Sequence, residues 1–212
     1  MRFPGWRRPA GVAAVAAPAL MWAEFLTMGN LRPGYNLLTR PFSDLATRGT
    51  PHADLFALGF FFVPGALTVV LGLGLWLAVR GDHAWRLGAL MVAVAGIFLF
   101  ATGAFPQIPG SQSAAVLHGV VSQTCFAIAS AAPLALYIGS RDRSIASPRQ
   151  LWLAAGIASI AIELLAIALR PVAHYPDGLF QRPFTFVLTI WFVTTGAWLL
   201  RGRESARPWI PA

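Results

Sequence analysis

The 212-residue chain contains no lysine, one cysteine and few charged side chains. Only 11% of its residues are charged, whereas a soluble domain carries about 25%, so the composition argues against a water-soluble protein. Without lysine, the chain cannot contain a phosphate-binding loop that ends in Gly-Lys-Ser or Gly-Lys-Thr. Cys125 has no second cysteine to join, which excludes a disulfide within the chain, a cysteine zinc cage and a thiol pair.

All sixteen basic residues are arginines, and they give the chain a formal net charge of +8. They lie scattered between apolar blocks rather than in one cluster, so they do not indicate a nucleic-acid surface. We therefore expect no nucleic-acid partner. The sequence likewise shows no motif that would bind a cofactor, and none is expected.

Hydrophobic residues make up 57% of the chain, and its mean hydropathy is +0.63. A helix needs about 20 predominantly apolar residues to cross a bilayer core of roughly 30 Å. Six segments meet this requirement: residues 11–31, 55–79, 86–105, 114–138, 150–170 and 184–200. Together they leave no room for a soluble domain. The sequence therefore predicts an all-α fold, a polytopic transmembrane bundle of six helices that forms a single integral membrane domain over residues 1–212.

Arginine counts predict the orientation of the bundle, because loops that stay in the cytoplasm are enriched in basic residues. The side that holds both chain ends receives eleven of the sixteen arginines, and the other side receives five. We therefore expect a multi-pass protein of the cell membrane with both termini in the cytoplasm. The stretch Ala17-Pro18-Ala19 resembles a signal-peptide cleavage site, but apolar character continues to Leu26, which favours an uncleaved first helix.

Several residue types within the spans predict how the helices pack. Small residues let helix backbones approach closely in lipid, and those expected to do so are Gly72, Gly74, Gly88, Gly96, Gly119, Ser122, Ala155 and Ser159. Pro64 with Gly65 is expected to kink the second helix. Tryptophans near the predicted helix ends are interpreted as interface anchors; they are Trp6, Trp85, Trp152, Trp198 and Trp209.

Two carboxylates, Glu24 and Glu163, interrupt the apolar pattern inside the spans. Each lies seven or eight residues before an Arg-Pro pair, which at about 1.5 Å per residue places both about 10–12 Å inside the outer boundary of the membrane. An ionisable group at that depth costs a few kcal/mol unless it is paired or protonated, which makes it a functional candidate by default. Equal depth does not show whether the two residues face one cavity.

The surroundings of these two carboxylates are alike in sequence. Arg40-Pro41-Phe42-Ser43 follows Glu24, and Arg182-Pro183-Phe184-Thr185 follows Glu163. The likeness indicates either a parallel repeat, with a ligand site between its halves, or independent use of Arg-Pro where helices begin and end.

Further polar residues gather at the predicted outer ends of the helices: Asp44, His52, Asp54, His118, His174, Tyr175 and Asp177. No His-x-x-x-His or His-Glu-x-x-His spacing occurs among them, so no metal site is predicted. The simplest interpretation is that His118 forms a hydrogen bond with a loop while the others face water.

Four short motifs resemble a known family. They are Tyr35 followed by Ser43-Asp44-Leu45, Gly103-Ala104-Phe105-Pro106, His118, and Gly178-Leu179-Phe180-Gln181-Arg182. In this order, and with six spans, the chain resembles over about residues 15–200 a bacterial inner-membrane family catalogued as domain of unknown function 998. The resemblance implies a six-helix fold and a shared outer cluster of Asp44, His118 and Arg182. It implies no reaction.

The leading hypothesis is that the protein binds a membrane lipid or small amphiphile in a polar pocket near the outer leaflet. Arg40 and Arg182 would meet an anionic head and His118 would orient it. Asp44 and Tyr35 complete the predicted ligand-binding set.

A membrane-embedded enzyme, such as an acid-initiated isoprenoid cyclase, is the first alternative. Its catalytic candidates are Glu24 as the acid and Glu163 or His118 as the base. Trp22 or Trp191 would form an aromatic wall that stabilises a cation. A small transporter or transporter subunit is the second alternative, for which a single short chain would have to form a homodimer.

Overall fold

The computed structural model describes residues 4–78, 82–140, 148–169 and 176–201, and these form helices and loops without a strand. The short 3-10 helix η1 (Pro4–Trp6) leads into α1 (Arg7–Leu31), and η2 (Phe42–Ala46) lies in the segment that follows. The second span is continuous through α2 (Ala53–Phe56), the π-helical turn η3 (Ala57–Phe62) and α3 (Val63–Ala78). The other spans are α4 (His83–Ala104), α5 (Gln112–Gly139), α6 (Arg149–Leu169) and α7 (Asp177–Arg201). The described residues thus contain six helices long and apolar enough to cross a membrane, which confirms the predicted six-helix membrane fold.

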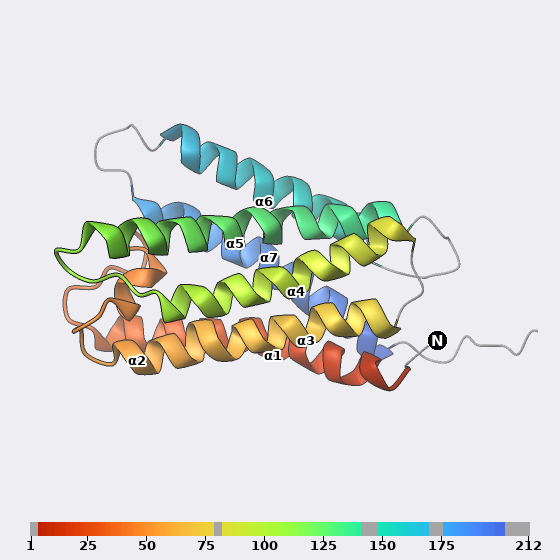
Figure 1. The fold of residues 1–212 in the computed structure, drawn as a ribbon, viewed down its shortest axis with the longest axis horizontal. Helices are drawn as coiled ribbons and strands as arrows, with labels where there is room; N and C mark the ends of the chain where they lie inside the picture. Colours follow the sequence, from red (N-terminus) through yellow and green to blue (C-terminus); the bar gives the residue numbers. More distant parts are fainter. Residues whose placement is uncertain (1–3, 79–81, 141–147, 170–175, 202–212) are drawn as a thin grey trace, which may run out of the picture.

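The six spans form a ring in which each packs against the next along the chain and α7 packs back against α1 (Figure 1). α1 starts and α7 ends at the same end of the bundle, which we call the termini end. The opposite end, which we call the loop end, holds the segment between α1 and α2 and the start of α7. α6 packs mainly against α5 and α7, and Figure 1 shows it leaning away from α5 toward the loop end.

The bounds of the last span differ from the prediction. The predicted span starts at residue 184, directly after Pro183, whereas α7 begins at Asp177 and contains Pro183. A proline removes only one N–H from the helical hydrogen-bond ladder, and an acidic residue in the first turn stabilises a helix start. The polar first turns of α7 are therefore helical as well, and they carry Gln181 and Arg182 into the bundle.

Glycines bring the helix backbones into contact, as the sequence predicts for most of them. A Cβ atom at Gly72 would lie 2.8 Å from the Ala89 carbonyl oxygen and would also meet the backbone of Ala93, so α3 and α4 touch there. Gly96 meets the backbone of Gly65 in the same way. The prediction is wrong for Gly119, since nothing lies within 4 Å of its Cβ position.

The second span changes its helical winding just before Pro64. In η3 the N–H of Val63 reaches back five residues to the Leu58 carbonyl oxygen, which is the bond of a π-helical turn. Such a turn rearranges the hydrogen-bond ladder next to a proline that has no N–H to contribute. The predicted irregularity at Pro64 and Gly65 is therefore a wide turn that begins at Ala57.

The interface-anchor interpretation is wrong for Trp85 and Trp152, which lie in the first turns of α4 and α6 and are fully buried. Their ring centroids are 5.5 Å apart, and Trp198 packs 5.6 Å from Trp152. The indole N–H of Trp85 donates to the Leu75 carbonyl oxygen at 3.0 Å, and that of Trp152 donates to Thr195 Oγ1 at 2.9 Å. Because the protein itself supplies these acceptors, the tryptophans do not need the membrane–water interface.

Replacing Gly72 with alanine is expected to lower the free energy of unfolding by about 1–3 kcal/mol, because the added methyl group meets backbone that cannot move alone. Gly119→Ala is the matched control and is expected to be neutral or to gain up to about 1 kcal/mol in helix propensity. Thermal unfolding in mild detergent compares the two variants. Equal unfolding midpoints would contradict the close contact between α3 and α4.

Candidate functional site

A small cavity lies inside the ring of helices and has apolar walls. Its volume is about 80 Å³, and we call it the central cavity. Residues from α1, α3, α4, α5 and α7 line it: Ala17, Pro18, Met21, Thr68, Val92, Ala95, Leu99, Phe126, Ala129, Ala132, Phe184, Thr185, Leu188, Thr189, Trp191 and Phe192. The hydroxyls of Thr68 and Thr189 donate at 2.8 Å to carbonyl oxygens of their own helices, so they add little polarity to the wall.

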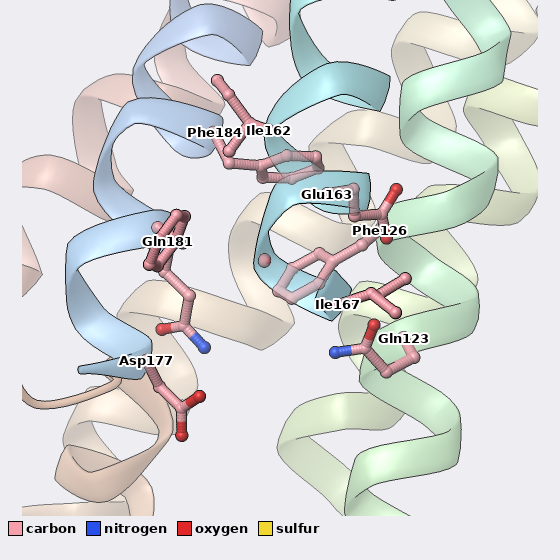
Figure 2. A pocket seen from close by; sticks show the side chains of 10 residues that line it. Gln123, Phe126, Ile162, Glu163, Ile167, Asp177, Gln181 and Phe184 are labelled. Carbon is pink, nitrogen blue, oxygen red and sulfur yellow. The ribbon is translucent and has the colours of Figure 1, made fainter. Parts of the chain in front are cut away.

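A second hollow, which we call the polar crevice, opens between α5, α6 and α7 (Figure 2). Its volume is about 50 Å³, and its ten lining residues are Gln123, Phe126, Ile162, Glu163, Ala166, Ile167, Asp177, Phe180, Gln181 and Phe184. Two of these are acidic, two are amides and none is basic. The crevice occupies the side of the bundle where α6 leans away from α5.

Hydrogen bonds fix two of the polar groups of the crevice. Ser130 of α5 donates its hydroxyl to Glu163 Oε2 at 3.2 Å, which orients the carboxylate on α6. Gln181 Oε1 accepts the backbone N–H of Phe42 at 3.0 Å, so its NH₂ group is the part that faces the crevice. From α5, the side-chain amide of Gln123 points toward Gln181 across the opening (Figure 2).

Phe126 and Phe184 line both hollows. Their ring centroids are 5.0 Å apart, with the rings tilted by 55°. One aromatic pair thus forms the wall between an apolar cavity and a polar crevice.

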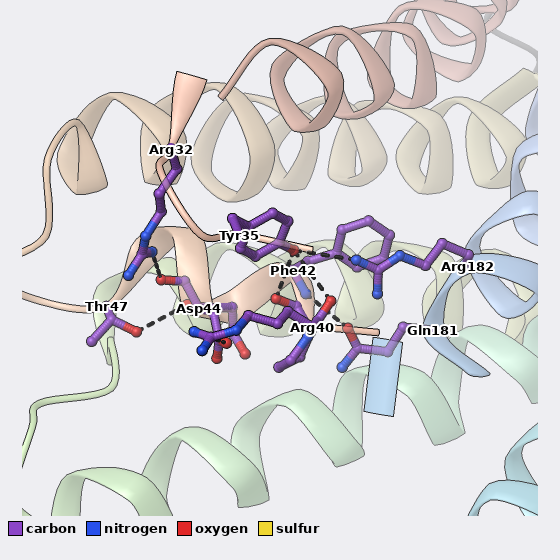
Figure 3. Close-up of polar contacts among 10 residues, drawn as sticks. Arg32, Tyr35, Arg40, Phe42, Asp44, Thr47, Gln181 and Arg182 are labelled. Carbon is purple, nitrogen blue, oxygen red and sulfur yellow. Dashed lines mark hydrogen bonds and ion pairs between the residues drawn. The ribbon is translucent and has the colours of Figure 1, made fainter. Parts of the chain in front are cut away.

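At the loop end, Arg182 of α7 is held by three aromatic side chains (Figure 3). Its guanidinium carbon lies 4.6 Å from the ring centroid of Phe42 and 5.0 Å from that of Phe25. Its Nη2 donates to the Tyr35 hydroxyl at 3.2 Å, and that hydroxyl donates to the Pro41 carbonyl oxygen at 2.9 Å. We call Phe25, Tyr35, Phe42 and Arg182 the arginine clamp; it attaches the segment after α1 to the start of α7.

Arg40 and Asp44 lie beside this clamp and form an ion pair at 3.5 Å (Figure 3). Arg32 donates to the backbone carbonyl oxygen of Asp44. Burial raises the pKa of the Asp44 carboxyl, while the charges of Arg40 and Arg32 oppose the shift. Four of the five predicted ligand-binding residues, Tyr35, Arg40, Asp44 and Arg182, are therefore neighbours.

His118, the fifth, lies apart from them. Its side chain is buried, and Nδ1 is 2.8 Å from the carbonyl oxygen of Phe105, the residue that follows α4. Within the described residues it makes no hydrogen bond or ion pair with Asp44 or Arg182 and lines neither hollow. This arrangement agrees with the simpler interpretation of the sequence, in which the His118 side chain forms a hydrogen bond with a loop.

Glu24 and Glu163 face different parts of the ring. Glu24 packs on Gly59 of the π-helical turn, where a Cβ atom would lie 2.9 Å from its carboxylate. Its Oε1 is buried and has no hydrogen-bond partner among the described residues. Glu163 lines the polar crevice, whereas Glu24 is absent from the walls of both hollows. The two carboxylates therefore share no cavity in the described part of the chain.

The two similar Arg-Pro-Phe motifs adopt different local structures. Arg40-Pro41-Phe42-Ser43 forms the end of a loop and the first turn of η2, whereas Arg182-Pro183-Phe184-Thr185 lies inside α7. The segment that precedes the second motif, residues 170–175, lies outside the described residues, and it includes Arg170, His174 and Tyr175. Independent use of Arg-Pro accounts for this difference better than a repeat does.

Sequence reasoning missed Gln123 and Phe126 as site residues and quoted Gln181 only as part of a family motif. Gln123 carries a detectable signal, because an amide in the middle of an apolar span needs a partner or a cavity. Phe126 carries none, since an isolated phenylalanine is ordinary in a membrane helix. Of the proposed aromatic walls, Trp191 lines the central cavity, and Trp22 donates its indole N–H to Thr189 Oγ1 at 2.8 Å.

The chain matches the family model described as "Protein of unknown function (DUF998)" over residues 15–198, and it belongs to that family. This confirms the resemblance found in the sequence motifs. No curated protein and no solved structure matched the chain.

Tyr35→Phe is expected to lower the free energy of unfolding by about 1 kcal/mol at neutral pH, because Arg182 Nη2 loses its acceptor in a partly buried site. Burial raises the pKa of Tyr35 above its ordinary value of 10.0, although Arg182 opposes the shift. The contribution of the neutral hydroxyl is therefore complete below the unfolded-state pKa and is lost as pH rises through the higher folded-state pKa.

The stability difference between wild type and Tyr35→Phe should accordingly shrink as pH rises from about 8 to about 11, measured by thermal unfolding. Tyr137→Phe is the control, since the Tyr137 hydroxyl makes no hydrogen bond among the described residues. A Tyr35 difference that stays constant or grows with pH would show that this hydroxyl does not hold Arg182.

Proposed function

We propose that this multi-pass membrane protein of the DUF998 family binds a small amphiphile, with its apolar tail in the central cavity and its polar head in the crevice between α5, α6 and α7. The observation that carries the proposal is the aromatic pair Phe126 and Phe184, which lines both hollows. An amphiphile needs an apolar space next to a polar one, and here a single pair of rings separates them.

The size of the hollows supports a small ligand. One water molecule takes up roughly 10–15 Å³ of a volume measured in this way. A crevice of about 50 Å³ therefore admits a head of only a few non-hydrogen atoms. A cavity of about 80 Å³ admits a short apolar segment, comparable to one isoprene unit or a few methylene groups. A longer tail would continue into the surrounding lipid between the helices.

The arginine distribution supports the location of this site. Eleven of sixteen arginines lie on the side of the chain ends, which supports an orientation with the termini end in the cytoplasm and the loop end outside the cell membrane. Glu163 lies six residues before the end of α6, about 9 Å from the loop end at a helical rise of about 1.5 Å per residue. In this proposed orientation, the crevice opens at the depth of the outer leaflet.

The arginine clamp then has a positioning role. Arg182 is engaged by Tyr35, Phe25 and Phe42 and does not line the crevice, so it does not meet the head directly. It holds Phe42 against α7, and the backbone N–H of Phe42 orients Gln181. Tyr35, Arg40 and Asp44 contribute in the same indirect way, by keeping the loop on the start of α7.

The geometry gives less support to the enzyme alternative. An acid-initiated cyclase needs its acid beside the substrate, and Glu24, the candidate acid, borders neither hollow. Trp191 lines the central cavity, but an aromatic wall also suits simple binding. We therefore propose binding without a reaction.

A bulky residue in the central cavity should block the tail. Ala129 lines the cavity, whereas Ala127, on the same helix, is exposed on the outside of the bundle. Ala129→Phe is expected to weaken binding about tenfold or more, because displacing two or three methylene groups from an apolar site costs about 0.8 kcal/mol each. Ala127→Phe should bind like wild type.

Isothermal titration in a neutral maltoside detergent, with octylamine, octanol and octanoate as separate probes, measures this effect. The proposal expects saturable binding of at least one probe to the wild type. Absence of saturable binding by all three, or equal weakening by both phenylalanine variants, would overturn it.

A further inference from the structure

The walls of the polar crevice carry charge of one sign. Glu163 and Asp177 contribute carboxylates, Gln123 and Gln181 contribute amides, and no arginine or histidine is among the ten lining residues. Of the described arginines at the loop end, Arg40 forms an ion pair with Asp44 and Arg182 donates to Tyr35, and neither lines the crevice. Among the residues that the structure describes, an anionic head placed in the crevice would therefore meet carboxylates and no basic side chain in its walls.

The carboxylates of the crevice have oxygen atoms that can accept hydrogen bonds from the head group of a ligand. Glu163 Oε2 accepts from Ser130, while its other oxygen receives no hydrogen bond among the described residues. Asp177 stands exposed at the rim and has no ion-pair partner in the described part of the chain. An ammonium group has three N–H donors and no acceptor, so it matches unused carboxylate oxygens, whereas a carboxylate or sulfate does not.

Aromatic rings supply a second feature that favours a cation. Phe126, Phe180 and Phe184 line the crevice together with the two carboxylates. The face of an aromatic ring attracts a cation through its quadrupole, and the attraction grows when water is excluded. A carboxylate at membrane depth also gains from a cationic partner, because an unpaired charge is costly there.

The small volume of the crevice sets an upper limit on the head. About 50 Å³ does not accommodate a sugar or a complete phosphodiester, but it does accommodate an ammonium group with the first carbon atoms of its tail. The tail would then pass Phe126 and Phe184 toward the central cavity.

We infer that the head group recognised by the polar crevice is a small cationic amine, held by Glu163 from α6 and by Asp177 at the rim. This inference rests on the proposed function, because it assumes that the crevice and the central cavity bind one ligand. The arginines in the sequence led us to expect an anionic head, whereas this inference gives the head a positive charge. It also makes Glu163 a residue that binds the ligand.

Selectivity among octylamine, octanol and octanoate tests the inference, since the three probes share one tail and differ only in the charge of the head. Octylamine is expected to bind wild type more tightly than octanol by a factor on the order of ten, the usual gain from a charge-assisted hydrogen bond, and octanoate is expected to bind least. Glu163→Gln should remove most of the preference for the amine while leaving octanol binding unchanged. Asp177→Asn, at the exposed rim, should reduce the preference without affecting the fold.

Glu24→Gln is the matched control, because Glu24 is the other carboxylate inside a span and borders neither hollow. It should leave both the affinity for octylamine and the order of the probes unchanged. Thermal unfolding of all three variants verifies that each is folded, and Asp177→Asn keeps the test decisive if Glu163→Gln does not fold.

The possible outcomes separate the inference from the proposed function. If octanol or octanoate binds wild type as tightly as octylamine, or if Glu24→Gln changes selectivity as much as Glu163→Gln, the amine assignment is wrong while amphiphile binding stands. Ammonium chloride is a further arm: if it competes with octylamine at equal concentration, the site binds a free cation and the tail contributes nothing, which overturns the proposed function. Failure of all three octyl probes to bind overturns both.

Discussion

The arrangement of the site depends on one half-buried charge, the guanidinium of Arg182, which packs against the rings of both Phe25 and Phe42. The contact joins α7 to α1 and to the segment that follows α1, so it closes the ring of helices at the loop end. It also brings the Phe42 N–H against Gln181, whose amide is a wall of the crevice. It acts together with the Gly178 N–H, which donates to the Thr39 carbonyl oxygen at 3.0 Å, to hold the start of α7 on the segment after α1.

In lipid, polar groups need partners within the protein, and several in the ring have one, whereas Glu24 Oε1 and Trp191 Nε1 have none among the described residues. Trp85, Trp152 and Thr68 donate to acceptors inside the bundle, and His118 lies against the carbonyl oxygen of the residue that follows α4. Glu163 is different, because only one of its oxygens accepts a hydrogen bond from the described residues while the side chain faces a crevice. The proposed ligand would give a carboxylate placed in this way a partner.

The sequence was sufficient to predict the six spans, because hydropathy over about 20 residues reports directly on membrane crossing. It also predicted the close packing at Gly72 and Gly96, since small residues mark helix contacts in lipid. It could not predict which way a side chain points: Glu24 and Glu163 have the same predicted depth, yet one packs on Gly59 and the other lines the crevice. Depth follows from counting residues, whereas rotation about the helix axis is set by neighbouring helices that are distant in sequence.

Photoaffinity labelling tests most directly the central claim that one ligand occupies both hollows. Octylamine with a diazirine at the end of its tail would be irradiated on the purified protein, and the labelled residues would be located by peptide mass spectrometry. The account predicts labels on the inner faces of α5 and α7, at residues such as Ala129 and Leu188 that line the central cavity, with excess octylamine suppressing them. Labels confined to lipid-exposed positions such as Leu164 and Leu165, unaffected by excess octylamine, would contradict it.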